Sequence, residues 1–448
     1  MIKKKESKKK STVVSLFSGC GGLDLGFSDD FFEISAAYDI DQAAIDCIRH
    51  NLKCKAEVLD VSTDKFDSEL DKIGKADIVL GGFPCQGFSK AGPKKKKDPR
   101  NLLYLSMLKA VERLQPYVFV AENVDGMAQN FKGEYLKLIQ NDFEKSGYIV
   151  ESRILNAVNF GVPQYRRRVF FVGIKKTLNK TFEWPKPTHF GGSRNGEFKT
   201  EHEYGTALSL FEPIDLKPSV TLKDALSDLL EKDESYPDHE ISTIPKTKDL
   251  AIMESIGEGK KLCNVRFSDT SVYTWQIPKA FGKVSNREIK ILETIGKNRR
   301  KKIYGSIPNG NPLSPEVISD LSKLKVNVDE LNSLAERGFL KKRDEKYDLK
   351  GAMFCSGLYK RPKWNEPAPT ILTVFHSARY FFHPQKLRPF TLRECARMQS
   401  FPDSFVFKKA GVTIDDGYRL VGNAVPPLLA SKMGESVRKI LERKENEA

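Results

Sequence analysis

Short apolar runs alternate with amphipathic stretches from residue 12 to about residue 175. The runs with the length and β-branched content of strands are 12–17, 34–39, 76–81, 117–122, 148–155 and 168–174. Between them, residues 101–115 and 133–147 have helical spacing, and the second stretch ends at a glycine, as helices often do. Strands that alternate with helices predict βαβ units, so we expect a doubly wound α/β domain.

This rhythm ends near residue 176, and the spacing stays irregular to about residue 350, with basic clusters such as GKNRRKK at 296–302. Regular patterns return at 366–375, at 391–401 and in a last helix from Pro427. The predicted organisation is therefore a basic tail at 1–11, an α/β domain at 12–175, a smaller irregular domain at 176–365 and a C-terminal segment at 366–448.

The charge indicates a polyanionic partner. The 448 residues include 74 Lys and Arg against 59 Asp and Glu, a net charge of +15 and a pI near 9.2. Nucleic acid is the commonest partner of such a chain, although a basic protein with no such partner remains an alternative. No apolar run is long enough to cross a bilayer, and none follows the N-terminal lysines, so we expect neither a membrane protein nor a secreted one.

Cysteine and histidine usage argues against disulfides and metals. The seven cysteines contain no C-x-x-C pair, which is typical of a reducing compartment. The six histidines never fall at metal-ligand spacing with a cysteine or with one another. We therefore expect metal-free chemistry.

A glycine-rich turn, LFSGCGGLDLGF at 16–27, follows the first strand and opens a helix. Glycines let a backbone approach a ligand closely, but Asp24 stands where a dinucleotide fingerprint has its third glycine. Asp39 lies 20 positions after Gly19, where a carboxylate can accept hydrogen bonds from ribose hydroxyls, and Asp60 follows another apolar run. Each acid alone is more simply an ordinary strand-end carboxylate, but together they favour an adenosine-containing cofactor.

Three further motifs stand at strand ends. Cys85, in GGFPCQGFS, follows the strand at 76–81, where open α/β sheets bind ligands. A lone cysteine is more often a small buried hydrophobe than a nucleophile. Glu122 ends the next strand as a helix cap or as a group that protonates a substrate, and Gln164, Arg166 and Arg168 share one face of the strand that they enter.

The ordered blocks LFSGCGGLDLG, PCQGFS, AENV, QYRRRVFFVG, RPFTLRECARMQSFPD and GYRLVGNAVPP closely resemble the cytosine-5 DNA methyltransferases. The resemblance covers roughly residues 12–175 and 365–440. It implies a Rossmann-like domain that binds S-adenosylmethionine and a smaller target-recognition domain, which corresponds to 176–365. It also implies that the C-terminal segment returns to the catalytic domain.

By the resemblance, Cys85 is the nucleophile that adds to C6 of cytosine, because C5 alone is too poor a nucleophile to take a methyl group. Glu122 would hold or protonate N3, and Arg166 would bind the base O2, with Arg168 beside it in the catalytic set. The target cytosine must leave the duplex to reach such a site.

The resemblance also implies the binding residues. The cofactor residues expected are Phe17, Ser18, Gly19, Gly21, Gly22, Leu23, Asp39, Ile40, Asp60, Val61, Pro84, Leu103, Asn423 and Ala424. The DNA-binding residues expected are Gln86, Ser89, Lys94, Lys95, Lys96, Lys97, Arg100 and Gln164. The loop from Phe88 to Arg100 is predicted to close over the DNA, with its lysines on phosphates. Asp39 departs from the family, which more commonly has a glutamate on the ribose.

The function implied is that of a bacterial DNA (cytosine-5-)-methyltransferase of a restriction-modification system, which protects host DNA from a cognate restriction enzyme. We expect a monomer that acts on double-stranded DNA, in the cytoplasm near the nucleoid. A tRNA cytosine-5 methyltransferase is the alternative, although that branch typically reads PCQPFT where this chain reads PCQGFS. A nicotinamide or flavin oxidoreductase and a non-catalytic DNA-binding protein are more distant alternatives.

Overall fold

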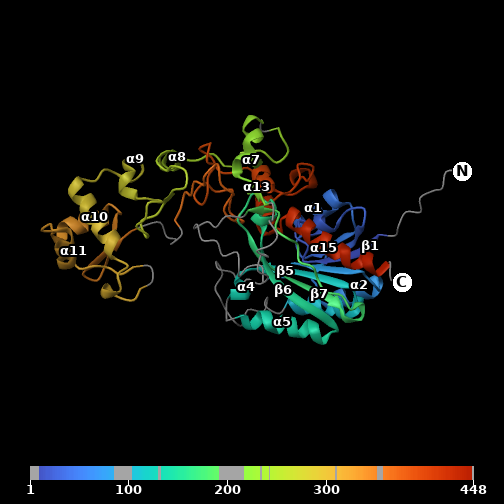
Figure 1. Ribbon diagram of the computed structural model, residues 1–448. Coiled ribbons are helices and arrows are strands. Elements are labelled where there is room, and N and C mark those ends of the chain that lie inside the picture. Colours follow the sequence, from blue (N-terminus) through green and yellow to red (C-terminus); the bar gives the residue numbers. More distant parts are fainter. Residues whose placement is uncertain are drawn as a thin grey trace. The chain divides into compact units, whose positions relative to one another are not determined.

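The computed structural model describes residues 10–84, 103–129, 133–190, 216–232, 235–241, 243–307, 310–350 and 357–445 (Figure 1). The chain divides into two compact units. Unit 1 comprises the chain up to Glu240, together with Asn365–Thr373 and everything from Leu392 onward. Unit 2 comprises Ile241–Trp364 and Val374–Thr391.

Unit 1 is built on a seven-stranded sheet of order β3-β2-β1-β4-β5-β7-β6. Its strands are β1 (Ser11–Leu16), β2 (Phe32–Asp39), β3 (Ala56–Val58), β4 (Ile78–Gly81), β5 (Val118–Val124), β6 (Tyr148–Asn156) and β7 (Arg167–Lys175). The first five strands pair in parallel, and β7 runs antiparallel to both β5 and β6. The strand order reverses between β1 and β4, the position where such sheets form a ligand crevice.

Helices cover both faces of this sheet. On one face, α1 (Gln42–Leu52) and α15 (Pro427–Glu445) share a core with residues of β1, β4 and β5, among them Val13, Ile78 and Val120. On the other, α2 (Asp64–Ile73), α3 (Tyr104–Leu114) and α5 (Glu134–Lys145) pack on Val14, Val79 and Phe119. Figure 1 shows α15 and α5 with the sheet between them. The predicted doubly wound α/β fold is confirmed.

Unit 1 also contains shorter helices. They are α4 (Gly126–Gln129), α7 (Leu222–Leu226), α13 (Leu392–Met398), α14 (Ile414–Asn423) and the 3-10 turns Asp24–Phe27, Ala157–Phe160, Lys176–Leu178, Ser227–Glu231 and Lys408–Ala410. A two-residue pair of strands, β8 (His189–Phe190) and β9 (Lys217–Pro218), completes the unit. No helix among the described residues is both long and apolar enough to cross a membrane.

The end of the chain packs against its beginning. A Cβ atom on Gly22 would lie 2.3 Å from the Val425 carbonyl oxygen, and one on Gly26 would lie 2.2 Å from the Ala430 carbonyl carbon. A side chain at either position would therefore require the C-terminal segment around Val425 and Ala430 to move.

The units are not divided at the predicted boundaries. The segment from residue 176 to Glu240 belongs to unit 1, because Phe182 and Trp184 pack into its core and the Trp184 indole N–H donates to Glu151 at 2.9 Å. The stretch 374–391, expected in the C-terminal segment, belongs to unit 2. Aromatic residues cause this difference, since Phe375 stacks on Phe381 within unit 2.

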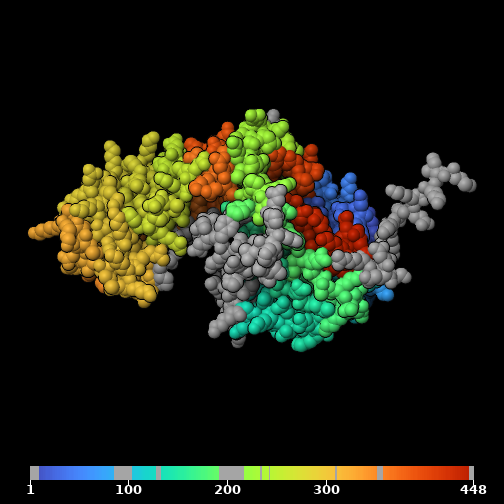
Figure 2. Space-filling model, in the orientation of Figure 1, coloured from blue at the N-terminus to red at the C-terminus, as the bar shows by residue number. Residues whose placement is uncertain are grey.

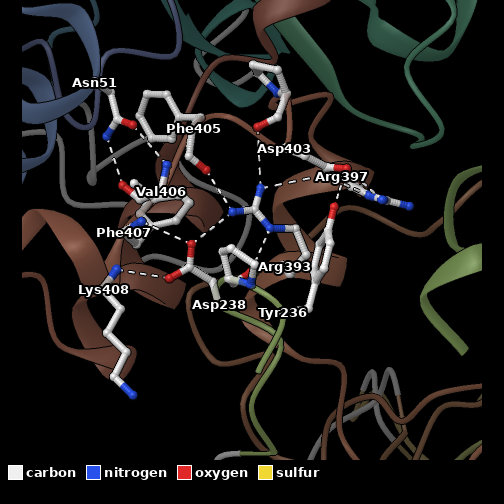
Figure 3. A network of polar contacts seen from close by, with 12 residues as sticks. Asn51, Tyr236, Asp238, Arg393, Arg397, Asp403, Phe405, Val406, Phe407 and Lys408 are labelled. Atoms are coloured by element: carbon white, nitrogen blue, oxygen red, sulfur yellow. Dashed lines mark hydrogen bonds and ion pairs between the residues drawn. The ribbon is translucent and has the colours of Figure 1, made fainter. Parts of the chain in front are cut away.

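A buried arginine joins three segments of unit 1 (Figure 3). Arg393, on α13, is fully buried and its guanidinium donates to Asp238 at 2.9 Å and to the carbonyls of Pro237, Pro402 and Phe405. The Asp238 carboxylate in turn accepts the backbone N–H groups of Phe407 and Lys408 at 3.0 and 2.9 Å. The Arg393 and Asp238 side chains thus hold α13, residues 237–238 and residues 402–408 together.

Unit 2, yellow to orange in Figure 2, is more regular than its sequence predicted. Its helices are α8 (Thr247–Glu254), α9 (Pro278–Phe281), α10 (Asn286–Asn298), α11 (Pro315–Ser322) and α12 (Val328–Glu336). Its strands are β10 (Lys261–Leu262), β11 (Ser271–Val272), β12 (Leu340–Arg343) and β13 (Lys346–Leu349). The helices α10, α11 and α12 each begin at a side-chain cap, Ser285, Ser314 and Asn327, which the frequent Pro, Gly and Lys residues obscured in the sequence.

Replacing Asp238 by alanine should lower the free energy of unfolding by about 3–5 kcal/mol, because the Arg393 charge would stay buried without a partner. Urea denaturation measures the loss. Asp228→Ala is the matched control: Asp228 also binds an arginine of α13, Arg397, but its side chain is 55% exposed and Arg397 keeps Asp403. The control should lose less than ~1 kcal/mol. Equal losses in the two variants would contradict the role assigned to the buried pair.

Candidate cofactor and catalytic site

A cavity of 960 Å³ opens at the carboxyl ends of β1, β2, β4 and β5. It lies where the strand order reverses, and all of its lining residues belong to unit 1. The predicted cofactor and catalytic residues in its lining are Phe17, Ser18, Gly19, Gly22, Leu23, Asp39, Ile40, Asp60, Val61, Pro84, Leu103, Glu122, Arg168, Asn423 and Ala424. The structure therefore brings together separate stretches of sequence around one space.

The glycine turn curves around Asp39. Phe17, Gly19 and Gly21 all have positive φ angles, of 54°, 55° and 85°. Conformations of this kind favour glycine, and they turn the Gly19 N–H towards the Asp39 carboxylate, which accepts it at 2.8 Å. The other oxygen of Asp39 accepts the Asp41 N–H at 3.0 Å. Asp39 is thus held in one orientation at the cavity and retains lone pairs for a ligand hydroxyl.

Two neighbouring strand ends extend this side of the cavity. Ile40, directly after Asp39, lines the cavity and is 68% exposed, which leaves an apolar surface for a flat ring. Asp60, beyond β3, accepts the Ser62 N–H and hydroxyl on a single oxygen at 2.9 and 2.6 Å. These hydrogen bonds hold the pKa of Asp60 below its ordinary value, so its second oxygen is available as an acceptor.

Glu122 and Arg168 face each other across the β5–β7 pairing. The register sets Val124 opposite Arg168, and the Arg168 Nε lies 2.8 Å from a Glu122 carboxylate oxygen. Both side chains are about nine-tenths buried. Burial raises the pKa of Glu122, and the charges of Arg168 and Arg166 oppose that rise. A carboxyl group with these opposed influences can bind a ligand as an acceptor or donate a proton to it.

Arg166 has a different environment from Arg168, although the two enter the strand on one face. Arg166 is fully buried, and its guanidinium donates to the carbonyls of Ile371 and Gly422 at 3.3 and 2.9 Å. It is absent from the cavity lining, whereas Arg168 is part of it. The base contact was predicted for Arg166, but the arginine in the cavity lining is Arg168.

Gln164 is likewise fully buried. Its amide donates to the Met398 carbonyl and to Gln399 at 3.2 and 2.9 Å, and its oxygen accepts the Ile371 N–H at 2.8 Å. With both ends of the amide engaged inside unit 1, it has no group left for DNA. This environment does not favour the predicted DNA contact by Gln164, which stays a prediction.

Several predicted residues lie outside the described residues: Cys85, Gln86, Ser89, Lys94, Lys95, Lys96, Lys97 and Arg100. The residues immediately before Cys85 are described. A Cβ on Gly82 would stand 3.7 Å from a Glu122 carboxylate oxygen, and the Asn123 amide donates to the Phe83 carbonyl at 2.8 Å. The chain therefore enters the Cys85 loop beside Glu122.

The cysteines nearest the glycine turn are poor nucleophiles. Burial raises the pKa of Cys20 to about 12 and that of Cys54 to about 11, so both remain thiols at neutral pH. Cys20 is buried and Cys54 is partly buried, and neither is in the cavity lining.

Sequence reasoning missed some cavity residues. Arg419, on α14, pairs with Asp41 and Asp416, and Thr373 reaches the cavity from the segment before unit 2 resumes. Arg419 stands in the GYRLVGN block, so its position could have been noticed; nothing in the sequence marks Thr373.

Asp24, which was also missed, is a fully buried carboxylate in the cavity lining. Its oxygens have no hydrogen-bond partner of normal geometry among the described residues, and burial raises its pKa to about 6. The acidic residues of the lining outnumber its two arginines, each of which pairs with a carboxylate. This charge balance suits a ligand that carries positive charge.

The comparisons with known proteins agree with this geometry. A family model described as C-5 cytosine-specific DNA methylase matches residues 11–439. Type II methyltransferase M.NgoFVII of Neisseria gonorrhoeae is 29% identical over 432 residues, which cover 96% of this chain and 87% of that protein. Type II methyltransferase M.AgeI of Thalassovita gelatinovora is 29% identical over 468 residues, which cover 95% and 99%.

One solved structure supports the fold. It is the crystal structure of a protein assigned as a DNA modification methyltransferase encoded within an E. coli prophage. It superposes with a TM-score of 0.52 at 24% identity, over 97% of this chain and 100% of that one.

Replacing Asp24 by asparagine should stabilise the protein by about 3 kcal/mol at pH 7, because a shift in pKa from 3.8 to about 6 disfavours the charged folded state by that amount. A raised carboxyl pKa makes the wild type lose stability as pH rises from about 4 to about 6, so the gain should vanish near pH 4. Urea unfolding at several pH values measures it. Asp60→Asn, whose carboxyl pKa is lowered, should show no gain; an unstabilised Asp24→Asn variant would show that burial of this charge is not costly.

Proposed function

Because the chain belongs to the C-5 cytosine-specific DNA methylase family, we propose that it transfers a methyl group from S-adenosylmethionine to C5 of a cytosine within a specific duplex DNA sequence. The observation that carries this proposal is that the glycine turn, Asp39, Glu122 and Arg168 line one cavity. The lining also includes Pro84, the residue directly before Cys85. The resemblance seen in the sequence blocks is confirmed by the family match over nearly the whole chain.

The cavity residues fit the proposed cofactor. Asp39 would accept the ribose hydroxyls, Ile40 would pack on the adenine and Asp60 would accept its amino group. The glycine turn would bind the methionine end through backbone N–H groups. The acidic lining suits the positive charge of the sulfonium. When bound, S-adenosylmethionine supplies the methyl group that C5 accepts.

The protein groups activate the base. The Cys85 thiolate adds to C6 of cytosine, forming a carbon–sulfur bond and making C5 an enamine carbon. Glu122 hydrogen-bonds or protonates N3, so that the ring does not accumulate negative charge as the bond forms. Arg168 holds the Glu122 carboxylate and directs its remaining donors at the base O2. After transfer, loss of the C5 proton expels Cys85 and restores the aromatic ring.

The substrate and the biological role follow from the same proposal. A cytosine stacked inside a duplex cannot reach residues that line a cavity, so the base must be flipped out. The relatives carry the name Type II methyltransferase, which supports a role in protecting host DNA from a cognate restriction enzyme.

Incubation with mixed-sequence DNA and labelled S-adenosylmethionine should give label in DNA, and bisulfite sequencing should place 5-methylcytosine in one recurring sequence. Transfer to tRNA with none to DNA would contradict the proposal. The Cys85→Ser variant should lose turnover and also covalent capture of DNA that contains 5-fluorocytosine. Cys20→Ser is the control, because this buried thiol should be dispensable for capture. If Cys85→Ser still captured this DNA covalently, Cys85 would not be the nucleophile.

Substitution of Arg168 should change mainly kcat, whereas substitution of Arg166 should change mainly stability. Arg168→Gln removes the ion pair with Glu122, so kcat should fall about tenfold to a hundredfold with little change in the urea midpoint. Arg166→Gln breaks buried hydrogen bonds to two carbonyls, so the urea midpoint should fall. The reverse pattern, with stability reduced in Arg168→Gln and only kcat reduced in Arg166→Gln, would show that Arg166 rather than Arg168 contacts the base.

A further inference from the structure

The positive charge of this protein is concentrated in unit 2. Residues 241–364 and 374–391 contain 28 Lys and Arg against 14 Asp and Glu, which gives +14 of the +15 carried by the whole chain. Unit 1, which holds the cavity, is therefore almost neutral overall. The excess cations of unit 2 therefore favour this unit as a surface that binds a polyanion.

Within unit 2, residues 286–349 have the element order of a winged helix-turn-helix domain. Helix α10 is followed by an extended residue, Leu313, which pairs in both directions with Tyr347 of β13 at 2.8 Å. Then come α11, a turn at 323–327, α12 and the antiparallel hairpin β12–β13. Three helices, a turn between the second and third, and a hairpin that takes a third short strand from before α11 define that domain type.

One core unites these elements. Ile291 and Ile295 of α10, Ile318 of α11 and Leu331 and Leu334 of α12 are all buried in the same cluster. The inward residues of the hairpin, Leu340, Tyr347 and Leu349, belong to that cluster as well. The turn is braced by Ser319, whose hydroxyl bonds both the N–H and the carbonyl of Val326 at 3.2 and 3.4 Å.

The helix that usually enters the major groove in such domains is poorly suited to do so here. Helix α12 exposes Asp329 and Glu336, and its Glu330 pairs with Arg287 of α10 at 2.9 Å. It carries no lysine or arginine within its bounds. Carboxylates on that face would repel phosphates.

The outer face of the hairpin has the opposite charge. The register places Lys341 opposite Asp348 and Arg343 opposite Lys346, and cross-strand partners point to the same side. Because Leu340, Tyr347 and Leu349 occupy the inner side, Arg343 and Lys346 are displayed outward, and both are exposed.

On this side of the hairpin, only the end near the turn is exposed, because Arg299 covers Asp348 at the other end. Asp348 is buried under Arg299, with Nε and a terminal nitrogen of the guanidinium 2.5 and 2.8 Å from its two oxygens. Lys341 pairs with the same carboxylate at 3.3 Å. Arg299 is directly followed by the exposed residues Arg300, Lys301 and Lys302, so the basic loop starts at the point where the hairpin is anchored.

We infer that residues 286–349 form a winged helix-turn-helix module that binds the phosphates of duplex DNA through the outer face of its hairpin, Arg343 and Lys346, and through the loop 300–302, rather than through α12. The inference rests on the proposed function, since it names the surface of unit 2 that holds the DNA substrate. The buried Arg299–Asp348 pair keeps this surface in one conformation, which reduces the entropic cost of binding.

The test is the salt dependence of DNA binding by the full-length protein. The double variant Arg343→Glu/Lys346→Glu should bind a duplex that contains the methylation site at least ~10-fold more weakly in low salt. The slope of log affinity against log salt should become shallower by about 0.9 for each phosphate that the variant no longer neutralises, or about 2 for the pair. Titration with a fluorescent duplex at several salt concentrations measures both, and unchanged binding of S-adenosylmethionine verifies that unit 1 is folded.

Two controls make the result specific. Lys65→Glu/Lys75→Glu changes the net charge by the same amount at exposed positions of unit 1 and should leave the slope unchanged. Ser333→Glu adds a carboxylate to the exposed side of α12 and should have little effect; a strong loss of affinity there would show that α12 enters the groove and overturn the inference. If Arg343→Glu/Lys346→Glu binds DNA with the slope and affinity of the wild type, the inference is also overturned, whereas the proposed function is unaffected as long as the wild type methylates DNA. Absence of methyl transfer to DNA in the wild type would instead refute the proposed function.

Discussion

The close approach of the glycine turn to the C-terminal segment is the constraint on which the rest of unit 1 depends. Gly22 and Gly26 leave no room for a side chain, so Val425 and Ala430 press directly on the turn. This packing brings Asn423 and Ala424 to the cavity beside Asp39, although nearly 400 residues separate them along the chain. The cavity exists because the last helix covers the face of the sheet on which the first turn lies.

A buried polar network also connects the start of β7 to the C-terminal segment. Gln164 and Arg166, from the segment that leads into β7, bind carbonyls and an N–H of Met398, Ile371 and Gly422. Gln399 continues the network to the Val421 carbonyl at 2.7 Å. These hydrogen bonds fix the start of β7, and thereby set Arg168 against Glu122. Of the three residues that share this spacing, Arg168 thus lines the cavity, whereas Gln164 and Arg166 form buried hydrogen bonds that orient the strand.

The separation of charge between the units suits a division of labour. Unit 1 is nearly neutral and has an acidic cavity, which fits a small cationic cofactor, while unit 2 carries the excess of lysine and arginine. Cations placed around the cavity would compete with the cofactor for its carboxylates. Concentrating them on a separate unit avoids that competition and still provides the field that attracts DNA.

The local pattern of the sequence was enough to predict the α/β class, the strands of the sheet and the carboxylates at their ends, because period and strand-end position are properties of neighbouring residues. The motif blocks were enough to predict the family. Tertiary structure alone decided that Arg168 rather than Arg166 reaches the cavity, since both share a strand face and only the carbonyls of Ile371 and Gly422 distinguish them. It also decided how the helices and the hairpin of residues 286–349 come together, because their core is assembled from side chains up to about 60 positions apart.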